Sequence, residues 1–470
     1  MKLSKPCALL LCALPLLAGC AVGPDYVRPT VDMPSAYKEA AGAGDWKPAE
    51  PRDEAAHGDW WTLYGDVQLN ALVQQVAVDN QNVRAAAASY RQALAALGTA
   101  RAGAWPSLTT AVSASRGVAA GATALRNTDR LALAANWEAD LWGRIGRNVE
   151  ANEAAALASS ADLNAALLSA QATLVQTYLQ LQVNDAQRQL LEQTVDAYRR
   201  SLQITRNRYD AGVAGRSDVV RAEAQLQSVQ AQAIDLGVQR AQLEHAIALL
   251  VGKAPSAFSL APKSDTAARL PALPVIPAAI PSQLLERRPD IAAAERRIAA
   301  ANAQIGVAQA AYFPALTIAG ALGYQSDSFS QLLTAPNRFW SLGPALALTL
   351  FDGGARGAAK EGALAAYDKS VAGYRQMVLA AFQEVEDNLA ALRVLAEEAG
   401  MQSLATGSAR ELVKLSTNQY LAGTVSYLNV ASAQAASLSA ERSSLDIRSR
   451  RLIASVALLK ALGGDWQQLH

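Results

Sequence analysis

The chain contains the same unusual motif twice. Residues 208–220 read RYDAGVAGRSDVV and residues 419–430 read QYLAGTVSYLNV, so each copy has a tyrosine, a glycine three positions later and a short polar stretch. The repeat extends beyond this motif, because LGTARAGAWPSLTT at 97–110 aligns with IGVAQAAYFPALTI at 305–318. A repeat this long predicts that the two halves of the chain adopt the same fold.

Prolines mark the boundary between the two halves. Six of them lie between residues 254 and 282, which is too many for a helix or a central strand. We therefore predict a lipid-anchored extended segment at 20–60, a first repeat at 61–253, a proline-rich linker at 254–282 and a second repeat at 283–470.

Apolar residues recur every seven positions in each half, which is the pattern of a coiled-coil seam. The seam residues are Val229, Leu236, Leu243 and Leu250 after the first motif, and Leu438, Leu445, Leu452 and Leu459 after the second. The arm from about Val149 to Arg208 would form a helix roughly 90 Å long. Because Gly212 and Gly423 can adopt the positive φ that ends a helix, we expect helical hairpins with tips at about 209–218 and 420–429.

Four shorter segments alternate apolar and polar residues, which indicates strands at about 105–115, 129–142, 313–324 and 340–351. Aromatic residues near the strand ends fit the girdles of a membrane barrel. The polar faces of the strands would then line a wet lumen. The side chains that we assign to this lumen are Asn136, Glu138, Asp140, Thr317 and Thr349.

Four strands cannot close a barrel in lipid, because about eight are needed to leave no open edge. Three copies of the chain would supply twelve strands, an even number with simple symmetry. The sequence therefore predicts a mixed α and β fold with two internal repeats. Long helical hairpins would form a tunnel, and four strands per chain would contribute to a 12-stranded trimeric β-barrel.

The first twenty residues, MKLSKPCALLLCALPLLAGC, have the basic start and apolar run of an export signal. The stretch Leu17-Ala18-Gly19-Cys20 resembles a bacterial lipobox. It implies a signal peptide at 1–19 and a diacylglyceryl and N-acyl lipid on Cys20. After cleavage Cys20 is the one cysteine left, so no internal disulfide or cysteine metal site is possible. Ala21 favours sorting to the outer membrane, with the acyl chains holding the N-terminus at its periplasmic face.

The residue content argues against an enzyme and against nucleic-acid binding. The net charge is +1, which gives no electrostatic reason to expect nucleic acid. The three histidines are far apart, and no Gly-x-Ser-x-Gly or phosphate-loop sequence occurs. We therefore predict no catalytic residue, no metal site and no cofactor besides the lipid.

The order of several short motifs resembles the TolC-like outer membrane factor family, and within it the NodT-type lipoproteins of resistance-nodulation-division efflux systems. The resemblance covers nearly the whole mature chain. The motifs that carry it are Cys20-Ala21-Val22-Gly23-Pro24-Asp25-Tyr26, Asp59-Trp60-Trp61, Glu286-Arg287-Arg288-Pro289-Asp290-Ile291 and the two Tyr/Gly turns.

The resemblance implies a homotrimeric channel in the outer membrane with a helical extension across the periplasm. Its far end would meet a periplasmic adaptor protein and, through it, an inner-membrane transporter that delivers drugs or other small molecules. By position, the residues that match the inner, gate-forming tip are Tyr420, Gly423, Leu428, Asn429 and Ser432. Those that match the outer tip, where the adaptor would bind, are Tyr209, Gly212, Ser217 and Asp218.

The inner tip departs from the family pattern. Members of the family often have aspartates at the positions of Asn429 and Ser432, and some have an arginine at that of Val425. We therefore expect a gate narrowed mainly by Leu428 and neutral hydrogen bonds, with Asp218 as a possible bonding partner for Tyr420.

Two other functions fit parts of the sequence. An outlet for type I secretion or metal efflux would share the architecture. A structural coiled-coil lipoprotein that conducts nothing would share the helices, but it has no need of polar residues on one face of each strand.

Overall fold

A computed structural model describes residues 22–31, 37–39, 58–118, 123–262, 270–274 and 287–464. The predicted signal peptide and Cys20 lie outside the described residues, as does much of the proline-rich linker. The chain divides into two compact units. Unit 1 comprises residues 1–31, 88–161 and 293–376, and unit 2 comprises residues 32–87, 162–292 and 377–470.

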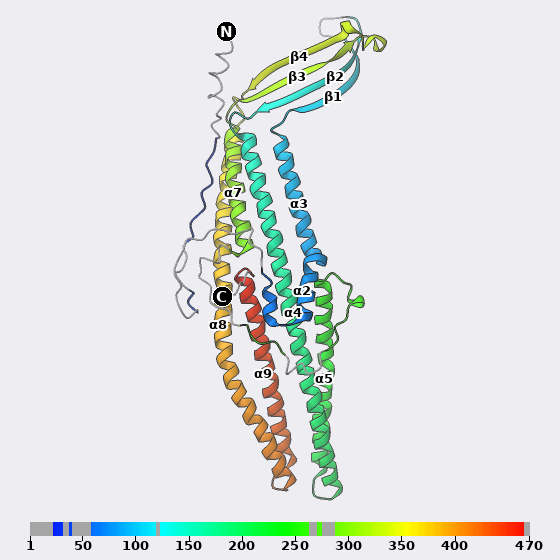
Figure 1. The fold of residues 1–470 in the computed structure, drawn as a ribbon, viewed down its shortest axis with the longest axis vertical. Helices are drawn as coiled ribbons and strands as arrows, with labels where there is room; N and C mark the ends of the chain where they lie inside the picture. Colours follow the sequence, from blue (N-terminus) through cyan, green and yellow to red (C-terminus); the bar gives the residue numbers. More distant parts are fainter. Residues whose placement is uncertain are drawn as a thin grey trace. The chain divides into compact units, whose positions relative to one another are not determined.

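The strands of unit 1 form one antiparallel sheet in the order β1-β2-β3-β4 (Figure 1). They are β1 (Ser107–Gly117), β2 (Arg126–Ala139), β3 (Ala315–Ser326) and β4 (Arg338–Ala347). The outer strands β1 and β4 each pair on one side only among the described residues. Every residue of β1 is exposed in the isolated chain, including Leu108 and Val112. The prediction of four strands is confirmed, and two edges of the sheet are left open.

Two of the predicted lumen residues do not lie in strands. Asp140 follows the end of β2, and its carboxylate accepts hydrogen bonds from the backbone N–H groups of Ile145 and Gly146 at 3.0 and 2.7 Å. Thr349 follows the end of β4. The predicted ends of the second and fourth strands, at 142 and 351, lie beyond the last ladder pairs at Ala139 and Ala347, because the alternating pattern runs on past the ladder. The assignment of Asp140 and Thr349 to the lumen stays a prediction. Asn136, Glu138 and Thr317 lie within β2 and β3.

The two longest helices each contain 67 residues, or about 100 Å at the usual rise. They are α4 (Arg144–Asp210) and α8 (Ala355–Leu421), and each begins in unit 1 and ends in unit 2. Unit 1 also contains most of α7 (Pro289–Ala310) and most of α3 (Gln81–Ala102). No helix among the described residues is long and apolar enough to cross a membrane.

In unit 1, Arg147 near the start of α4 fixes the described N-terminal segment. Its guanidinium donates to the carbonyls of Val22 and Gly23, each at 3.3 Å, and to the carboxylate of Asp25 at 2.8 Å. Gly23 has φ 109°, and a Cβ there would lie 2.5 Å from the Cα of Gly306. Glycine is therefore required where the segment crosses α7.

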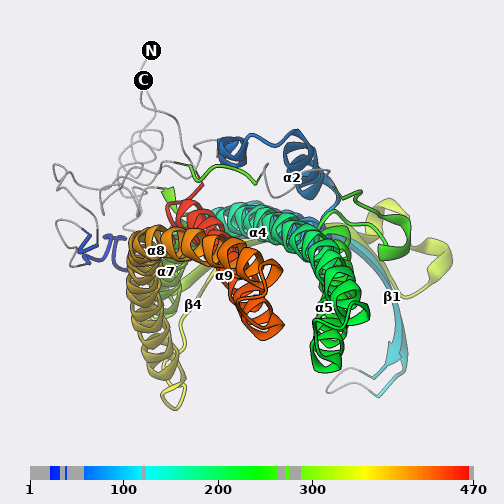
Figure 2. The same ribbon diagram turned by 90° about the horizontal axis from the view of Figure 1, so that it is seen from below.

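Unit 2 contains the later parts of α4 and α8 together with α5 (Arg216–Leu250), α9 (Tyr427–Ala461) and α2 (Val67–Asp79). Figures 1 and 2 show α8, α9, α4 and α5 side by side in that order. The predicted seam is buried at Val229, Leu236, Leu452 and Leu459. Short 3-10 helices occur at Trp60–Tyr64, Pro255–Ala257, Phe329–Gln331 and Ala335–Asn337.

Candidate functional site: the tips of the two helical hairpins

The two hairpins reverse through turns of the same geometry. We call α4 and α5 hairpin 1, and α8 and α9 hairpin 2. The turn of hairpin 1 is tip 1 (residues 211–215), and the turn of hairpin 2 is tip 2 (residues 422–426). Gly212 and Gly423 both have φ 75°. In tip 1 the Val213 N–H donates to the Arg208 carbonyl at 2.9 Å, and in tip 2 the Thr424 N–H donates to the Gln419 carbonyl at 3.0 Å. These hydrogen bonds are typical of a helix that ends at a glycine. The two turns therefore lie at the positions that the sequence predicted.

An apolar cluster joins the two hairpins just behind their tips. Tyr420 at the end of α8 and Tyr427 at the start of α9 pack edge to face with ring centroids 5.6 Å apart. They are buried against Leu202 of α4 and Ala222 of α5, with Val430 and Ala431 completing the cluster. Since both hairpins contribute to this cluster, separating the tips would expose two buried aromatic rings.

Arg208 of α4 reaches across to the end of α8. Its guanidinium carbon lies 4.8 Å from the centroid of the Tyr420 ring, and its Nη1 donates to the Leu421 carbonyl at 3.0 Å. Leu421 is the last residue of α8, so the cation lies at the negative end of that helix and satisfies one of its free carbonyls. We call this arrangement the Arg208 clamp.

The Arg208 clamp adds a charged group to the expected chemistry of the tip. The sequence predicted a gate narrowed mainly by Leu428 and neutral hydrogen bonds, because tip 2 has no charged residue of its own. The charged group that contacts the end of α8 is Arg208 of the other hairpin. The sequence signal was present, since Arg208 immediately precedes Tyr209 and aligns with Gln419 in the second repeat. The alignment does not show that the Arg208 side chain contacts hairpin 2.

Hydrogen bonds between the hairpins surround the clamp. The Tyr420 hydroxyl donates to Thr205 Oγ1 at 3.4 Å, and Thr205 is fully buried. Thr205 takes the place of Asp218, which the sequence had offered as a possible bonding partner for Tyr420. Gln225 of α5 accepts from the Tyr427 hydroxyl at 3.4 Å. Burial, with smaller contributions from nearby tyrosines and the Asp218 charge, raises the pKa of Tyr427 to about 12, so its hydroxyl stays protonated at neutral pH.

The other predicted tip residues lie at the surface of the isolated chain. Leu428 is 46% exposed, and Asn429 and Ser432 are exposed on the first turns of α9. On hairpin 1, Tyr209 is 42% exposed, in contrast to its buried equivalent Tyr420. Ser217 is exposed and Asp218 is half-buried. The residues that sequence reasoning missed are Thr205, Arg208, Gln225 and Tyr427.

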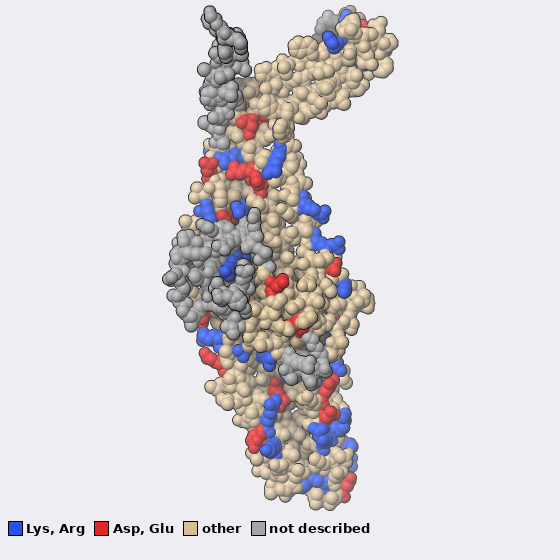
Figure 3. Space-filling model, viewed as in Figure 1, with Lys and Arg blue, Asp and Glu red and all other residues tan. Residues whose placement is uncertain are grey.

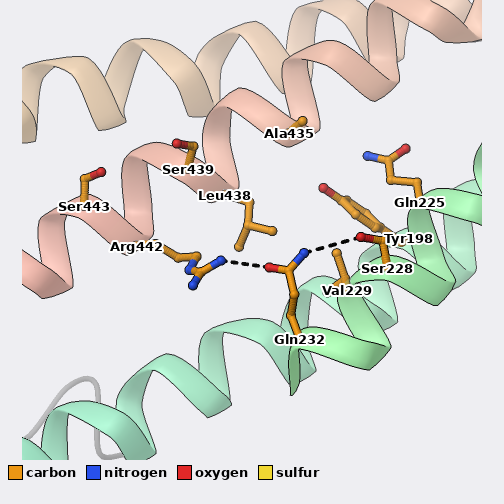
Figure 4. A pocket seen from close by; sticks show the side chains of 10 residues that line it. All are labelled: Tyr198, Gln225, Ser228, Val229, Gln232, Ala435, Leu438, Ser439, Arg442 and Ser443. Carbon is orange, nitrogen blue, oxygen red and sulfur yellow. Dashed lines mark hydrogen bonds between the residues drawn. The ribbon is translucent and has the colours of Figure 1, made fainter. Parts of the chain in front are cut away.

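A pocket of about 480 Å³ lies behind the tips, between α5 and α9 (Figure 4). Tyr198 of α4 lines it together with Leu438, and Arg442 donates to Gln232 across it at 2.8 Å. The lining is mixed polar and apolar. No group of three potential metal ligands occurs in the part of the chain that the structure describes.

Comparison with known proteins identifies the family. The model of the outer membrane efflux protein family matches residues 72–253 and 280–464, which is most of the chain. The chain belongs to this family of transport channels. Outer membrane protein OprJ of Pseudomonas aeruginosa is 32% identical over 96% of this chain and 94% of its own length. The cation efflux system protein CusC of Escherichia coli O6:H1 is 29% identical, over 99% of this chain and the whole of the relative.

Solved structures show the same fold. The outer-membrane channel OprN superposes with a TM-score of 0.86 at 32% identity, covering 95% of this chain and 100% of OprN. A structure of CusC superposes with a TM-score of 0.84 at 26% identity, covering 94% of this chain and 100% of CusC. The protein is therefore an outer membrane efflux channel component with the TolC-like fold.

Proposed function

We propose that three copies of the chain assemble into a passive exit duct of a tripartite efflux pump. An adaptor protein would bind the hairpin tips, and an inner-membrane transporter of the resistance-nodulation-division class would supply both cargo and energy. The observation that carries this proposal is the sheet with two open edges, β1 and β4. In lipid such edges must pair, and edge-to-edge pairing of three sheets gives a closed barrel.

The cargo in this proposal is a small molecule chosen by the pump. The related proteins are named for cation efflux, for pyoverdine export and as outer membrane proteins, so one architecture serves several cargoes. Asn136, Glu138 and Thr317 would face the barrel lumen. These polar side chains would keep the duct wet without selecting one compound.

The lipid on Cys20 is a second part of the proposal. Arg147 holds Val22, two residues further on, and the Val22 N–H donates to the Trp142 carbonyl at 3.1 Å. Trp142 lies where β2 gives way to α4, and its indole stacks on Phe313 with centroids 4.7 Å apart. A lipid two residues away would enter the bilayer beside the barrel's aromatic girdle.

The closed state of the duct would be held by the Arg208 clamp. While the clamp is made, hairpin 2 is fixed against hairpin 1 of the same subunit. Rotation of tip 2 outward would break the cation–π contact, the Leu421 bond and the Thr205 bond together. Adaptor binding would have to offset the loss of these three contacts with new ones.

Complementation tests the proposal. The full-length protein is expressed in cells that lack their own outer membrane channels but contain an adaptor and a pump, and dye efflux is measured alongside the oligomeric state in detergent. We expect a trimer, restored efflux and a lipidated N-terminus by mass spectrometry. The Cys20→Ser variant should lose the lipid. A monomer with no efflux and no conductance in planar bilayers would contradict the proposal and favour the structural lipoprotein.

A further inference from the structure

Another pocket, of about 220 Å³, lies on hairpin 2 away from the tips. Part of its lining comes from α9, namely Ser444, Ile447, Arg448 and Arg451. These residues recur at intervals of three and four positions, so they share one side of the helix. Ala399 of α8 and Leu273 of the described linker segment, residues 270–274, complete the lining.

Arg448 binds this linker segment to α9. Its Nη2 donates to the Leu270 carbonyl at 2.6 Å and to the Pro271 carbonyl at 3.3 Å. Leu270 is itself buried in the apolar core of unit 2. Both acceptors are neutral carbonyls, so these hydrogen bonds leave the positive charge of the guanidinium without a counter-charge.

Arg451 brings a buried donor to the same pocket. Its Nε is buried and has no hydrogen-bond partner among the described residues. A buried donor without an acceptor is destabilising, and most such groups in native proteins have a partner. An acceptor bound in the pocket satisfies this requirement.

The two arginines of the pocket repel each other. Burial and the neighbouring charge of Arg451 both lower the pKa of Arg448 below its usual value. In the part of the chain that the structure describes, no carboxylate forms an ion pair with either arginine. The carboxylates nearest in the sequence, Glu398 and Asp446, bond Arg450 at 3.0 and 3.1 Å. Asp446 and Arg450 lie on another side of α9, since neither falls on the three- and four-residue spacing of the pocket.

Other arginines of unit 2 have carboxylate partners. Charged side chains of both signs are interspersed along the helices (Figure 3). Arg410 pairs with Glu441 at 2.8 Å, and Arg393 pairs with Glu39 at 2.7 Å. The pocket differs from these pairs because two neighbouring cations line it without an anion among the described residues.

We propose that this pocket binds one small oxyanion, inorganic phosphate or an anion of its kind, between Arg448 and Arg451. Guanidinium groups present N–H donors in a geometry that matches phosphate oxygens, and the Ser444 hydroxyl adds a further donor. A volume of about 220 Å³ lies below the range of roughly 300–1,000 Å³ that is usual for larger ligands, which favours a free small anion.

The bound anion accepts from the Arg451 Nε and offsets the repulsion between the two arginines. It thereby strengthens the attachment of the linker segment 270–274 to hairpin 2. The site lies outside the tips and does not depend on the proposed duct.

Thermal unfolding of the purified full-length protein tests this inference, with inorganic phosphate as the probe. Phosphate replaces chloride at constant ionic strength, so that general screening stays the same. We expect a saturable rise in the midpoint temperature, because phosphate binds the folded state. Isothermal titration calorimetry should give one phosphate per chain.

Arg451→Gln should weaken phosphate binding at least tenfold. This variant is more informative than Arg448→Gln, which also removes the hydrogen bonds to the linker. The matched control is Arg442→Gln, which removes an exposed arginine of the same helix outside this pocket and should bind phosphate as the wild type does.

Two results would overturn the inference directly. One is the absence of a saturable rise in the wild type. The other is a rise of equal size in the wild type and in Arg451→Gln, which would show an adventitious ion only.

A third result would assign the pocket to the chain's own linker. Asp265 lies in the linker, outside the described residues. Phosphate binding to Asp265→Asn but not to the wild type would show that this carboxylate occupies the pocket in place of a free anion. Efflux and conductance are measured separately, so none of these results bears on the proposed function.

Discussion

The two tips share a backbone turn and differ in most of the side chains around it. Both reverse at a glycine with φ 75°, yet the equivalent tyrosines have opposite environments: Tyr209 is exposed and Tyr420 is buried. The alignment also places exposed Arg216 opposite buried Tyr427, and exposed Arg221 opposite Ser432. Glycine therefore specifies the turn, and the residues around it decide whether the tip is exposed or packed against the other hairpin. Exposed charged side chains lie around tip 1, and Arg208 of hairpin 1 contacts the Tyr420 ring and the Leu421 carbonyl beside tip 2. Tip 2 packs through its two buried tyrosines.

The largest expected effect concerns the cluster that joins the tips. Leu202→Ala should lower the free energy of unfolding by about 2–5 kcal/mol, because it leaves a cavity beside both buried tyrosines. Val213→Ala, on the exposed side of tip 1, should change it by less than about 0.5 kcal/mol. Denaturant unfolding followed by near-UV circular dichroism distinguishes the two. Equal losses would show that the tips do not share a core.

The paired tyrosines offer a direct comparison of gating. Tyr420→Ala removes the ring under Arg208 and the Thr205 hydrogen bond. The ratio of open to closed channels should therefore rise by roughly tenfold or more. Tyr209→Ala should leave it unchanged. Single-channel recording in planar bilayers measures both. A response of the same size from Tyr209→Ala would remove the distinction between the tips.

Leu428 and its equivalent Ser217 provide a smaller contrast. Leu428→Ala should make the closed pore leakier to large hydrophilic drugs, because an exposed apolar side chain would no longer narrow tip 2. Ser217→Ala serves as the control on hairpin 1. Drug susceptibility of cells that express each variant is the measurement, and unchanged susceptibility with Leu428→Ala would exclude it from the constriction.

The smallest effect is on pH dependence. The pKa of Tyr427 is raised from 10.0 to about 12, so the folded state favours the protonated hydroxyl. Its contribution to stability is complete below pH 10 and is lost as the pH rises toward 12. Tyr427→Phe should flatten the fall in stability over that range. If the wild type and this variant lose stability in parallel, the hydroxyl does not contribute.

The sequence predicted the repeat, the strands and the hairpins because each has a local signature. Gly212 and Gly423 marked the turns, and the alternation around Leu131 and Leu133 marked β2. It extended β2 and β4 past their last ladder pairs, to Asp140 and Thr349, since alternation does not show where ladder hydrogen bonds stop.

The side-chain contacts between the two hairpins could not be predicted from local sequence patterns. Whether Arg208 pairs within its hairpin or reaches Leu421 depends on how two helices from opposite repeats pack, and that information is tertiary. Tyr427 was missed because a tyrosine at the start of a helix is ordinary until its neighbours from the other hairpin bury it.

The most direct test of the Arg208 clamp is the conductance of purified channels that carry Arg208→Ala, with Arg206→Ala as the matched control on the same helix. Arg206 pairs with Glu223 inside hairpin 1 and makes none of the clamp contacts that Arg208 makes. The account predicts a clear rise in open probability for Arg208→Ala, none for Arg206→Ala, and intact trimers in both. Closed, wild-type-like recordings from Arg208→Ala would show that the clamp does not hold the tips together.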